Sequence, residues 1–178
     1  MKKEIILGVT GSIAIYKALD LIRLLKEKNF NVSVIMTKEA EELIKPLTFQ
    51  TISNNPVYTA MFLPRQESNP LHIRLAERGD LLLICPATAN IIGKIAHGIC
   101  DDLLTSTVIS TRAPVLICPA MNENMYKNKI VQENIQKLKK LGYVFVGPVK
   151  GRLACGETGL GHLAPLEEIV EAVVSKLK

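Results

Sequence analysis

Residues 4–25, EIILGVTGSIAIYKALDLIRLL, join a short apolar segment to a longer amphipathic one through a turn that contains glycine. The first part, residues 4–9, is a nearly continuous apolar run of strand length, which is typical of a buried β-strand. In the second part, apolar residues recur at helical spacing, at positions 15, 18, 19, 22 and 25. The stretch therefore predicts a strand, a tight turn and an amphipathic α-helix.

The same alternation continues along the chain. Short runs rich in Ile, Val and Leu predict four more strands, at Val32–Met36, Leu81–Cys85, Val115–Cys118 and Val144–Val146. An apolar stripe after Pro165 predicts a closing helix. These elements predict an α/β fold, a Rossmann-like doubly wound parallel sheet with helices on both faces. We expect a single domain over residues 1–178, with residues 51–69 as its least regular stretch.

The composition is that of an ordinary globular protein, with 48% hydrophobic and 22% charged residues. The net charge is +5, but aromatic residues make up only 4%, and the densest basic cluster, Lys137, Lys139 and Lys140, fits a solvated helix face. No nucleic-acid partner is expected. Because no apolar run reaches the roughly 18 residues of a membrane span and no signal peptide is visible, we expect a cytoplasmic protein without membrane contact.

Four cysteines are spread along the chain, at Cys85, Cys100, Cys118 and Cys155. Their spacing contains no CxxC pair, the arrangement from which zinc and dithiol redox sites are usually built. We therefore predict no metal site and expect each cysteine to be a free thiol.

Ligands of a doubly wound sheet bind outside the carboxyl ends of the strands, so residues that follow strands are candidates for a site. Residues 10–12, 37, 86–90 and 119–122 all lie there. In GVTGSIA, residues 8–14, the amides of Gly11, Ser12 and Ile13 can hold a phosphate, since the turn opens a helix. The alternative is a strand-to-helix turn that only needs small residues.

The kind of nucleotide follows from what the motifs lack. The glycine spacing is G-x-x-G-x-x-A, and the second strand ends in Met36–Thr37 without the acid that binds an NAD ribose, so a dinucleotide is disfavoured. Gly93–Lys94 lacks the other residues of a P-loop. A mononucleotide such as FMN fits this pattern better than a dinucleotide does, because Ser12, Thr37 and Thr88 offer neutral hydroxyls at three strand ends.

Four motifs carry a family resemblance: GVTGSIA (8–14), PATANIIGKIAHGICDDLLT (86–105), PAMNENMY (119–126) and ACGETGLG (154–161). In this order they resemble the phosphopantothenoylcysteine decarboxylases, of the homo-oligomeric flavin-containing cysteine decarboxylase superfamily. The resemblance implies FMN as cofactor, and a homotrimer or a higher oligomer of trimers.

The resemblance also implies roles for individual residues. The FMN contacts would be Gly11, Ser12, Ile13, Thr37, Thr88, Ala89, Asn90, Ile91 and Ala120. His72 would be the active-site histidine and Cys155 the proton donor, while Asn122, Arg152 and Ala154 would meet the substrate. From the residues alone, a surface histidine, a helix N-cap at Asn122 and an exposed salt bridge at Arg152 remain alternatives.

The implied activity is that of a carboxy-lyase in coenzyme A biosynthesis, which converts 4'-phosphopantothenoylcysteine to 4'-phosphopantetheine. Oxidation of the substrate thiol to a thioaldehyde places a C=S group beta to the carboxylate, carbon dioxide leaves, and the flavin then re-reduces the product. An imidazole such as His72 titrates near pH 6.5 and suits the thiol proton. Cys155, as a thiol of pKa about 8.5, is mostly protonated at neutral pH and can act as the acid.

Gly151, Gly156, Gly159 and Gly161 around that cysteine favour a substrate flap over residues 150–165. Tyr126 stands where the family usually has tryptophan, and residues 161–165 replace a more typical ending of glycine, arginine or alanine, methionine, glutamate and proline. Because the chain ends at Lys178, a separate ligase protein is expected for the preceding step.

Three other functions remain open. They are oxidative decarboxylation of a peptide C-terminal cysteine, flavin prenyl transfer on a related fold, and a flavin-binding regulatory subunit. Cys155 and Asn122 favour the first-named decarboxylase over these, because the peptide decarboxylases lack the ACG motif and the prenyltransferases lack PAMN.

Overall fold

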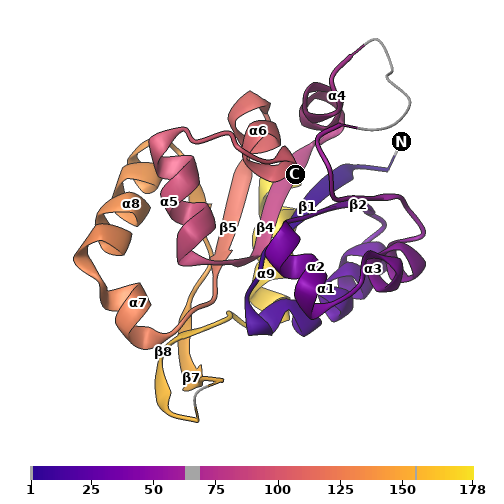
Figure 1. Cartoon of the computed structure of the whole chain (residues 1–178). Coiled ribbons are helices and arrows are strands. Elements are labelled where there is room, and N and C mark those ends of the chain that lie inside the picture. Colours follow the sequence, from indigo (N-terminus) through magenta and orange to yellow (C-terminus); the bar gives the residue numbers. More distant parts are fainter. Residues whose placement is uncertain (1, 63–68, 155) are drawn as a thin grey trace.

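A computed structural model describes residues 2–62, 69–154 and 156–178. Its centre is a six-stranded sheet in the order β3-β2-β1-β4-β5-β6, in which every neighbouring pair is parallel. The strands are β1 Glu4–Val9, β2 Asn31–Met36, β3 Val57–Tyr58, β4 Leu81–Ala87, β5 Val115–Pro119 and β6 Val144–Phe145. A separate antiparallel hairpin, β7 Val149–Arg152 and β8 Thr158–His162, projects from one end of the sheet (Figure 1).

Helices cover both faces of the sheet because alternate strand residues point to opposite sides. Ile5, Leu7 and Val9 of β1 belong to one buried cluster, whereas Ile6 belongs to the other. Helices α1 Tyr16–Glu27, α3 Pro46–Ser53 and α9 Leu166–Leu177 pack on the first cluster. Helices α4 Leu71–Arg78, α5 Ala89–His97, α6 Leu103–Ser110 and α8 Lys129–Lys140 pack on the second.

The remaining helical segments are short and lie near strand ends. They are the 3-10 turn η1 Ile13–Ile15, α2 Lys38–Leu43 and α7 Glu123–Lys127. Three of the helices that follow strands begin at a side-chain cap, namely Thr37 for α2, Thr88 for α5 and Asn122 for α7. In the part of the chain that the structure describes, no helix has the length and apolarity needed to cross a membrane.

The predicted fold is confirmed, and so are the five predicted strands and the two predicted helices, with ends that differ by up to two residues. The sixth strand, β3, lies inside the stretch that we expected to be least regular, and its two residues are too few to form an apolar run. The basic cluster of Lys137, Lys139 and Lys140 lies on the last turn of α8, on its exposed side, as predicted.

β1 and β4 form the switch point of the sheet, since the chain continues from β1 to one side and from β4 to the other. Thr10, which follows β1, joins the two strand ends. Its hydroxyl donates to the Pro86 carbonyl at 2.7 Å and accepts from the Thr88 amide at 3.2 Å, and Thr10 is only 2% exposed. One buried side chain therefore fixes the spacing of the crevice where ligands of this fold bind.

Replacing Thr10 by valine, which keeps the shape, is expected to lower the free energy of unfolding by about 2 kcal/mol. The variant leaves the Pro86 carbonyl and the Thr88 amide without their buried partner. Urea unfolding measures the change. Thr51→Val is the control, because that hydroxyl bonds the Leu47 carbonyl on an exposed helix face and its loss should change stability by less than about 0.5 kcal/mol. Equal effects of the two variants would contradict the role of Thr10.

Candidate active site

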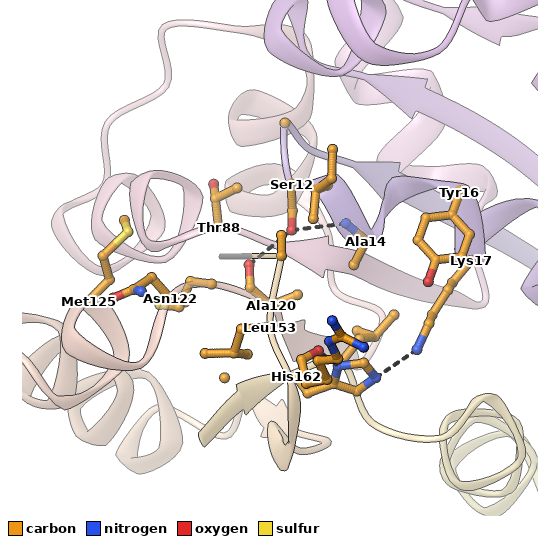
Figure 2. A pocket seen from close by; sticks show the side chains of 17 residues that line it. Ser12, Ala14, Tyr16, Lys17, Thr88, Ala120, Asn122, Met125, Leu153 and His162 are labelled. Atoms are coloured by element: carbon orange, nitrogen blue, oxygen red, sulfur yellow. Dashed lines mark hydrogen bonds between the residues drawn. The ribbon is translucent and has the colours of Figure 1, made fainter. Parts of the chain in front are cut away.

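A pocket of about 690 Å³ lies at the carboxyl ends of β1, β4 and β5, and the β7–β8 hairpin forms one of its walls. The volume is within the range of small-molecule sites. Eight of the predicted cofactor and substrate contacts line it: Gly11, Ser12, Ile13, Thr88, Ala120, Asn122, Arg152 and Ala154. Segments more than a hundred residues apart in the chain therefore meet here, as Figure 2 shows for Ser12, Thr88, Ala120 and Asn122.

The turn after β1 presents backbone amides at the pocket. The Ser12 amide donates to the Thr10 carbonyl at 2.8 Å, but no hydrogen bond within the described residues uses the amides of Gly11 and Ile13. The Ser12 hydroxyl donates to the Ala120 carbonyl at 3.1 Å, which ties this turn to the end of β5 (Figure 2). A Cβ at Gly11 would overlap the Cβ of Glu39, so only glycine fits there. The turn thus offers two amides for an anionic or polar ligand atom.

The other predicted cofactor contacts surround the pocket without lining it. Thr37 is 8% exposed and caps α2, where its hydroxyl accepts from the Ala40 amide. Ala89, Asn90 and Ile91 form the first turn of α5, directly after Thr88. Asn90 is exposed and Ile91 is buried in the second cluster. The structure therefore places these four near the same strand ends but outside the cavity.

Asn122 lines the pocket and is also the N-cap of α7, where its side-chain oxygen accepts from the Asn124 amide at 2.8 Å. This capping role was the alternative considered from the sequence. The cap fixes the direction of the side chain at the pocket edge, opposite to Lys17 and His162 (Figure 2). Capping and ligand contact are compatible, because an amide group carries donors and an acceptor on different atoms.

The hairpin is held against the end of β5 by two hydrogen bonds. The Met121 amide donates to the Gly161 carbonyl at 3.1 Å, and the Leu160 amide donates to the Glu123 carboxylate at 3.0 Å. Lys127 pairs with the same carboxylate at 3.0 Å. The Leu160 amide, with Lys127, lowers the pKa of Glu123 below its ordinary value. These contacts position Arg152 and Ala154 at the pocket.

Three of the four hairpin glycines lie where an added Cβ would crowd a neighbouring group. A Cβ at Gly151 would lie 2.8 Å from the His162 ring, and one at Gly159 would lie 2.8 Å from the Glu123 carboxylate. A Cβ at Gly161, where φ is +154°, would overlap the Met121 carbonyl oxygen. Of the four, only Gly156, with φ +91°, has open space around it, which fits the conformational freedom expected of a flap glycine.

Of the two predicted catalytic residues, His72 does not line this pocket. His72 lies on α4, at the end of the sheet away from the hairpin (Figure 1), and its Nδ1 is buried without a hydrogen-bond partner among the described residues. Cys155 lies outside the described residues, although its neighbour Ala154 lines the pocket. A single chain thus presents the predicted substrate contacts but keeps His72 elsewhere.

Several lining residues had no individually predicted role, chiefly Tyr16, Lys17, Met121, Met125, Leu153 and His162. Of these, Met121 lies in the candidate segment 119–122, and Leu153 and His162 lie in the predicted flap. Tyr16 and Lys17 begin α1 directly after the glycine turn, a position that could have drawn attention to them. Lys17 Nζ lies 2.8 Å from His162 Nε2 across the pocket edge. Met121 and Leu153 add apolar surface, so the pocket combines a mostly apolar lining with a few polar groups, as ligand sites usually do.

The cysteines that the structure describes are free thiols. Cys85 and Cys118 are neighbours in the buried sheet, where burial and the adjacent Cys85 raise the pKa of the Cys118 thiol well above its ordinary value. These two are therefore inert packing residues. Within residues 2–62, 69–154 and 156–178, no group of His, Cys, Asp and Glu side chains is arranged to hold a metal ion.

Comparisons with known proteins agree in sequence and in fold. The profile of the Flavoprotein family matches residues 1–178. The coenzyme A biosynthesis bifunctional protein CoaBC of Vibrio vulnificus (strain YJ016) is 46% identical over 168 residues, which cover 94% of this chain but 42% of that protein. The probable phosphopantothenoylcysteine decarboxylase of Streptococcus mutans is 42% identical over 179 residues, covering 99% of this chain and 100% of that one. The chain thus spans less than half the length of its CoaBC relatives.

Two solved structures are also similar over nearly their whole length. A PPC decarboxylase mutant complexed with pantothenoylaminoethenethiol has a TM-score of 0.91 and 30% identity, with 98% of each chain covered. The FMN binding protein AtHal3 has a TM-score of 0.87 and 31% identity, with 98% of this chain and 96% of that one covered.

Gly161→Ala is expected to detach the hairpin from β5, because the added methyl group would overlap the Met121 carbonyl. The Met121 amide should then exchange with solvent at least tenfold faster, and unfolding free energy should fall by about 1–3 kcal/mol. Amide exchange and urea unfolding measure these changes. Gly142→Ala is the control, since φ is +93° there but nothing lies within 4 Å. If both variants leave Met121 equally protected, close packing is not the reason for Gly161.

The docking of the hairpin should weaken in acid. A carboxyl whose pKa is lowered by folding stabilises the folded form above its ordinary pKa, here 4.5, and loses that contribution as pH falls through the lowered value. Exchange protection of the Leu160 amide should therefore drop as pH falls below about 4.5. In Glu123→Gln, whose amide oxygen can still accept, protection should not change with pH over this range. The same acid-induced drop in that variant would exclude Glu123 as its cause.

Proposed function

We propose, because the chain belongs to the Flavoprotein family, that it binds FMN and decarboxylates 4'-phosphopantothenoylcysteine to 4'-phosphopantetheine, a carboxy-lyase step of coenzyme A biosynthesis. The observation that carries the proposal is the composition of the pocket. One cavity is lined by the glycine turn after β1, the Asn122 loop after β5 and the hairpin that leads to Cys155. The match to the Streptococcus mutans relative along its whole length supports the same conclusion.

The turn after β1 fits a flavin mononucleotide. The amides of Gly11 and Ile13 have no partner within the described residues, and Gly11 lacks the Cβ that would collide with α2. Thr88 and Ala120 complete this side of the pocket, with Thr37 and residues 89–91 behind it. When bound, FMN would supply an acceptor for a hydride from the substrate CH2–SH group and would return it after carbon dioxide has left. The neutral donors around it suit a planar ring with polar edges.

Asn122 orients the substrate carboxylate. Its side-chain oxygen accepts from the Asn124 amide, and the NH2 group of the same side chain is the donor that a carboxylate requires. A neutral amide holds the carboxylate without the strong ionic attraction that would stabilise the charged ground state more than the transition state. Arg152 and Ala154 bound the same space from the hairpin side.

His72 accepts the thiol proton of the substrate in this proposal, and it does so from another copy of the chain. The imidazole does not line the pocket of its own chain, and its Nδ1 is buried without a partner among the described residues. We therefore include in the proposal a homotrimer, or an oligomer of trimers, in which α4 of one copy completes the pocket of the next.

Cys155 protonates the carbon of the enethiolate that remains after decarboxylation. This role comes from the ACGETGLG motif and from the place of Ala154 at the pocket. The residues around it, 150–165, form the wall that excludes water once substrate is bound. A protonated thiol suits the task because it can donate near neutral pH without a metal.

The cellular setting belongs to the same proposal. The free thiols of Cys85, Cys100 and Cys118 and a thiol substrate are suited to a reducing compartment, so we place the protein in the cytoplasm. A separate ligase makes the substrate, in keeping with the Streptococcus mutans relative, which this chain covers completely and which is named for the decarboxylase alone.

The proposal is tested with the purified protein, which should be yellow. Incubation with 4'-phosphopantothenoylcysteine should give a product that has lost carbon dioxide and nothing else, as measured by mass spectrometry. A product that has also lost two hydrogens would mean the oxidative reaction instead. A protein that neither binds FMN nor changes this substrate would overturn the proposal.

Cys155→Ser separates the two outcomes within the same assay. The variant should release carbon dioxide once, accumulate the oxidised enethiol and leave the flavin absorbance bleached. Cys100→Ser is the matched control, because that thiol is exposed and does not line the pocket. Normal product at the wild-type rate from Cys155→Ser would exclude this residue as the acid.

A further inference from the structure

Basic side chains gather at one end of the pocket. Lys17 lies on the first turn of α1, Arg152 is the last residue of β7 and His162 is the last residue of β8. Figure 2 shows Lys17 and His162 pointing toward each other on one side, with Thr88 and Asn122 on the other. The pocket therefore has a basic end and a neutral polar end.

The hydrogen bonds of His162 fix how the basic end is built. Its Nδ1 lies 3.0 Å from the Arg152 carbonyl, and a carbonyl oxygen only accepts, so Nδ1 carries a hydrogen. Its Nε2 lies 2.8 Å from Lys17 Nζ, and an ammonium group only donates, so Nε2 is the acceptor. His162 thus accepts from the Lys17 ammonium group and holds it at the pocket edge, and two N–H groups of that ammonium remain to bind a ligand.

Among the described residues, no ion pair balances the positive charge at this end. Elsewhere in the described chain, Lys94 pairs with Asp101 and Lys127 pairs with Glu123. Neither Lys17 nor Arg152 forms a salt bridge with any carboxylate in residues 2–62, 69–154 and 156–178. Lys17 is only half-exposed, so part of its hydration is already lost. A pair of unbalanced cations beside a cavity is a site for an anion.

We propose that Lys17 and Arg152 form a subsite for a phosphate monoester, with His162 as the residue that positions Lys17. A phosphate monoester carries close to two negative charges at neutral pH and several acceptor oxygens, which suits two cations better than a single carboxylate would. Asn122 at the neutral end remains available for the substrate carboxylate. The choice of ligand rests on the proposed function, which offers two such esters, the 4'-phosphate of the substrate and the phosphate of FMN.

Binding measurements on the FMN-loaded protein test the subsite without any turnover. Titration calorimetry compares 4'-phosphopantetheine with pantetheine, which differ only in the phosphate. Lys17→Met should weaken the binding of 4'-phosphopantetheine about tenfold or more, the factor expected for loss of a charge-assisted hydrogen bond. The affinity for pantetheine should not change. Lys28→Met, at the exposed C-cap of α1 and away from the pocket, removes the same charge and should change neither affinity.

A second comparison, of FMN with riboflavin on the apoprotein, identifies the source of the phosphate. Lys17→Met could reduce the preference for FMN over riboflavin by about tenfold without changing the affinity for 4'-phosphopantetheine. The subsite then holds the cofactor phosphate, and the proposal stands. If the variant changes neither preference, the proposal is wrong. Failure of the decarboxylase assay with an intact phosphate preference would instead overturn only the proposed function.

The positioning role of His162 has its own readout. His162→Ala should reduce the preference for the phosphorylated ligand toward that of Lys17→Met, because the ammonium group loses its acceptor. His162→Gln offers a side-chain oxygen in place of Nε2 and should restore part of the preference. A purely structural role would lower stability in both variants and leave the ratio of the two affinities unchanged.

Discussion

The buried hydroxyl of Thr10 is the constraint on which this site depends. β1 and β4 are parallel neighbours, but the chain continues to opposite sides of the sheet after them, so their carboxyl ends could separate. Thr10 bridges these ends through its hydrogen bonds to Pro86 and Thr88. Ser12 continues the connection to Ala120 at the end of β5. Three strand ends are thus held by two hydroxyl side chains from one turn. Loops attached to such a frame can carry the chemistry, because their starting points do not move.

Much of this arrangement could be predicted from the sequence, since it depends on local patterns. Apolar runs located the long strands, and the position of motifs after strands located the ligand site, including Gly11, Thr88 and Asn122. The two-residue strand β3 was missed because pairing with β2, and not its own composition, makes it a strand. Lys17 and His162 were missed for a similar reason: they are 145 residues apart, and only the docked hairpin brings them together.

The hairpin glycines show that a glycine can stand at a position for two different physical reasons, backbone freedom or close packing. A glycine-rich segment suggests freedom of the backbone, yet Gly151, Gly159 and Gly161 are where another group comes too close for a side chain. Sequence cannot separate these causes, because both exclude Cβ. The contacts with His162, Glu123 and Met121 separate them, and Gly156 is the one of these four glycines that has open space around it.

The wall that carries Arg152 is attached very differently from the sheet behind it. The sheet is buried on both faces by two apolar clusters. Of its described residues, the hairpin packs only Val149 against the first of them, and it is otherwise held by the Met121–Gly161, Leu160–Glu123 and Lys17–His162 hydrogen bonds. Segments with few apolar contacts open at a small fraction of the global unfolding free energy. The pocket can therefore exchange its contents by local opening while the core stays folded. Selection can tune the lifetime of a bound ligand at the hairpin, independently of the stability of the domain.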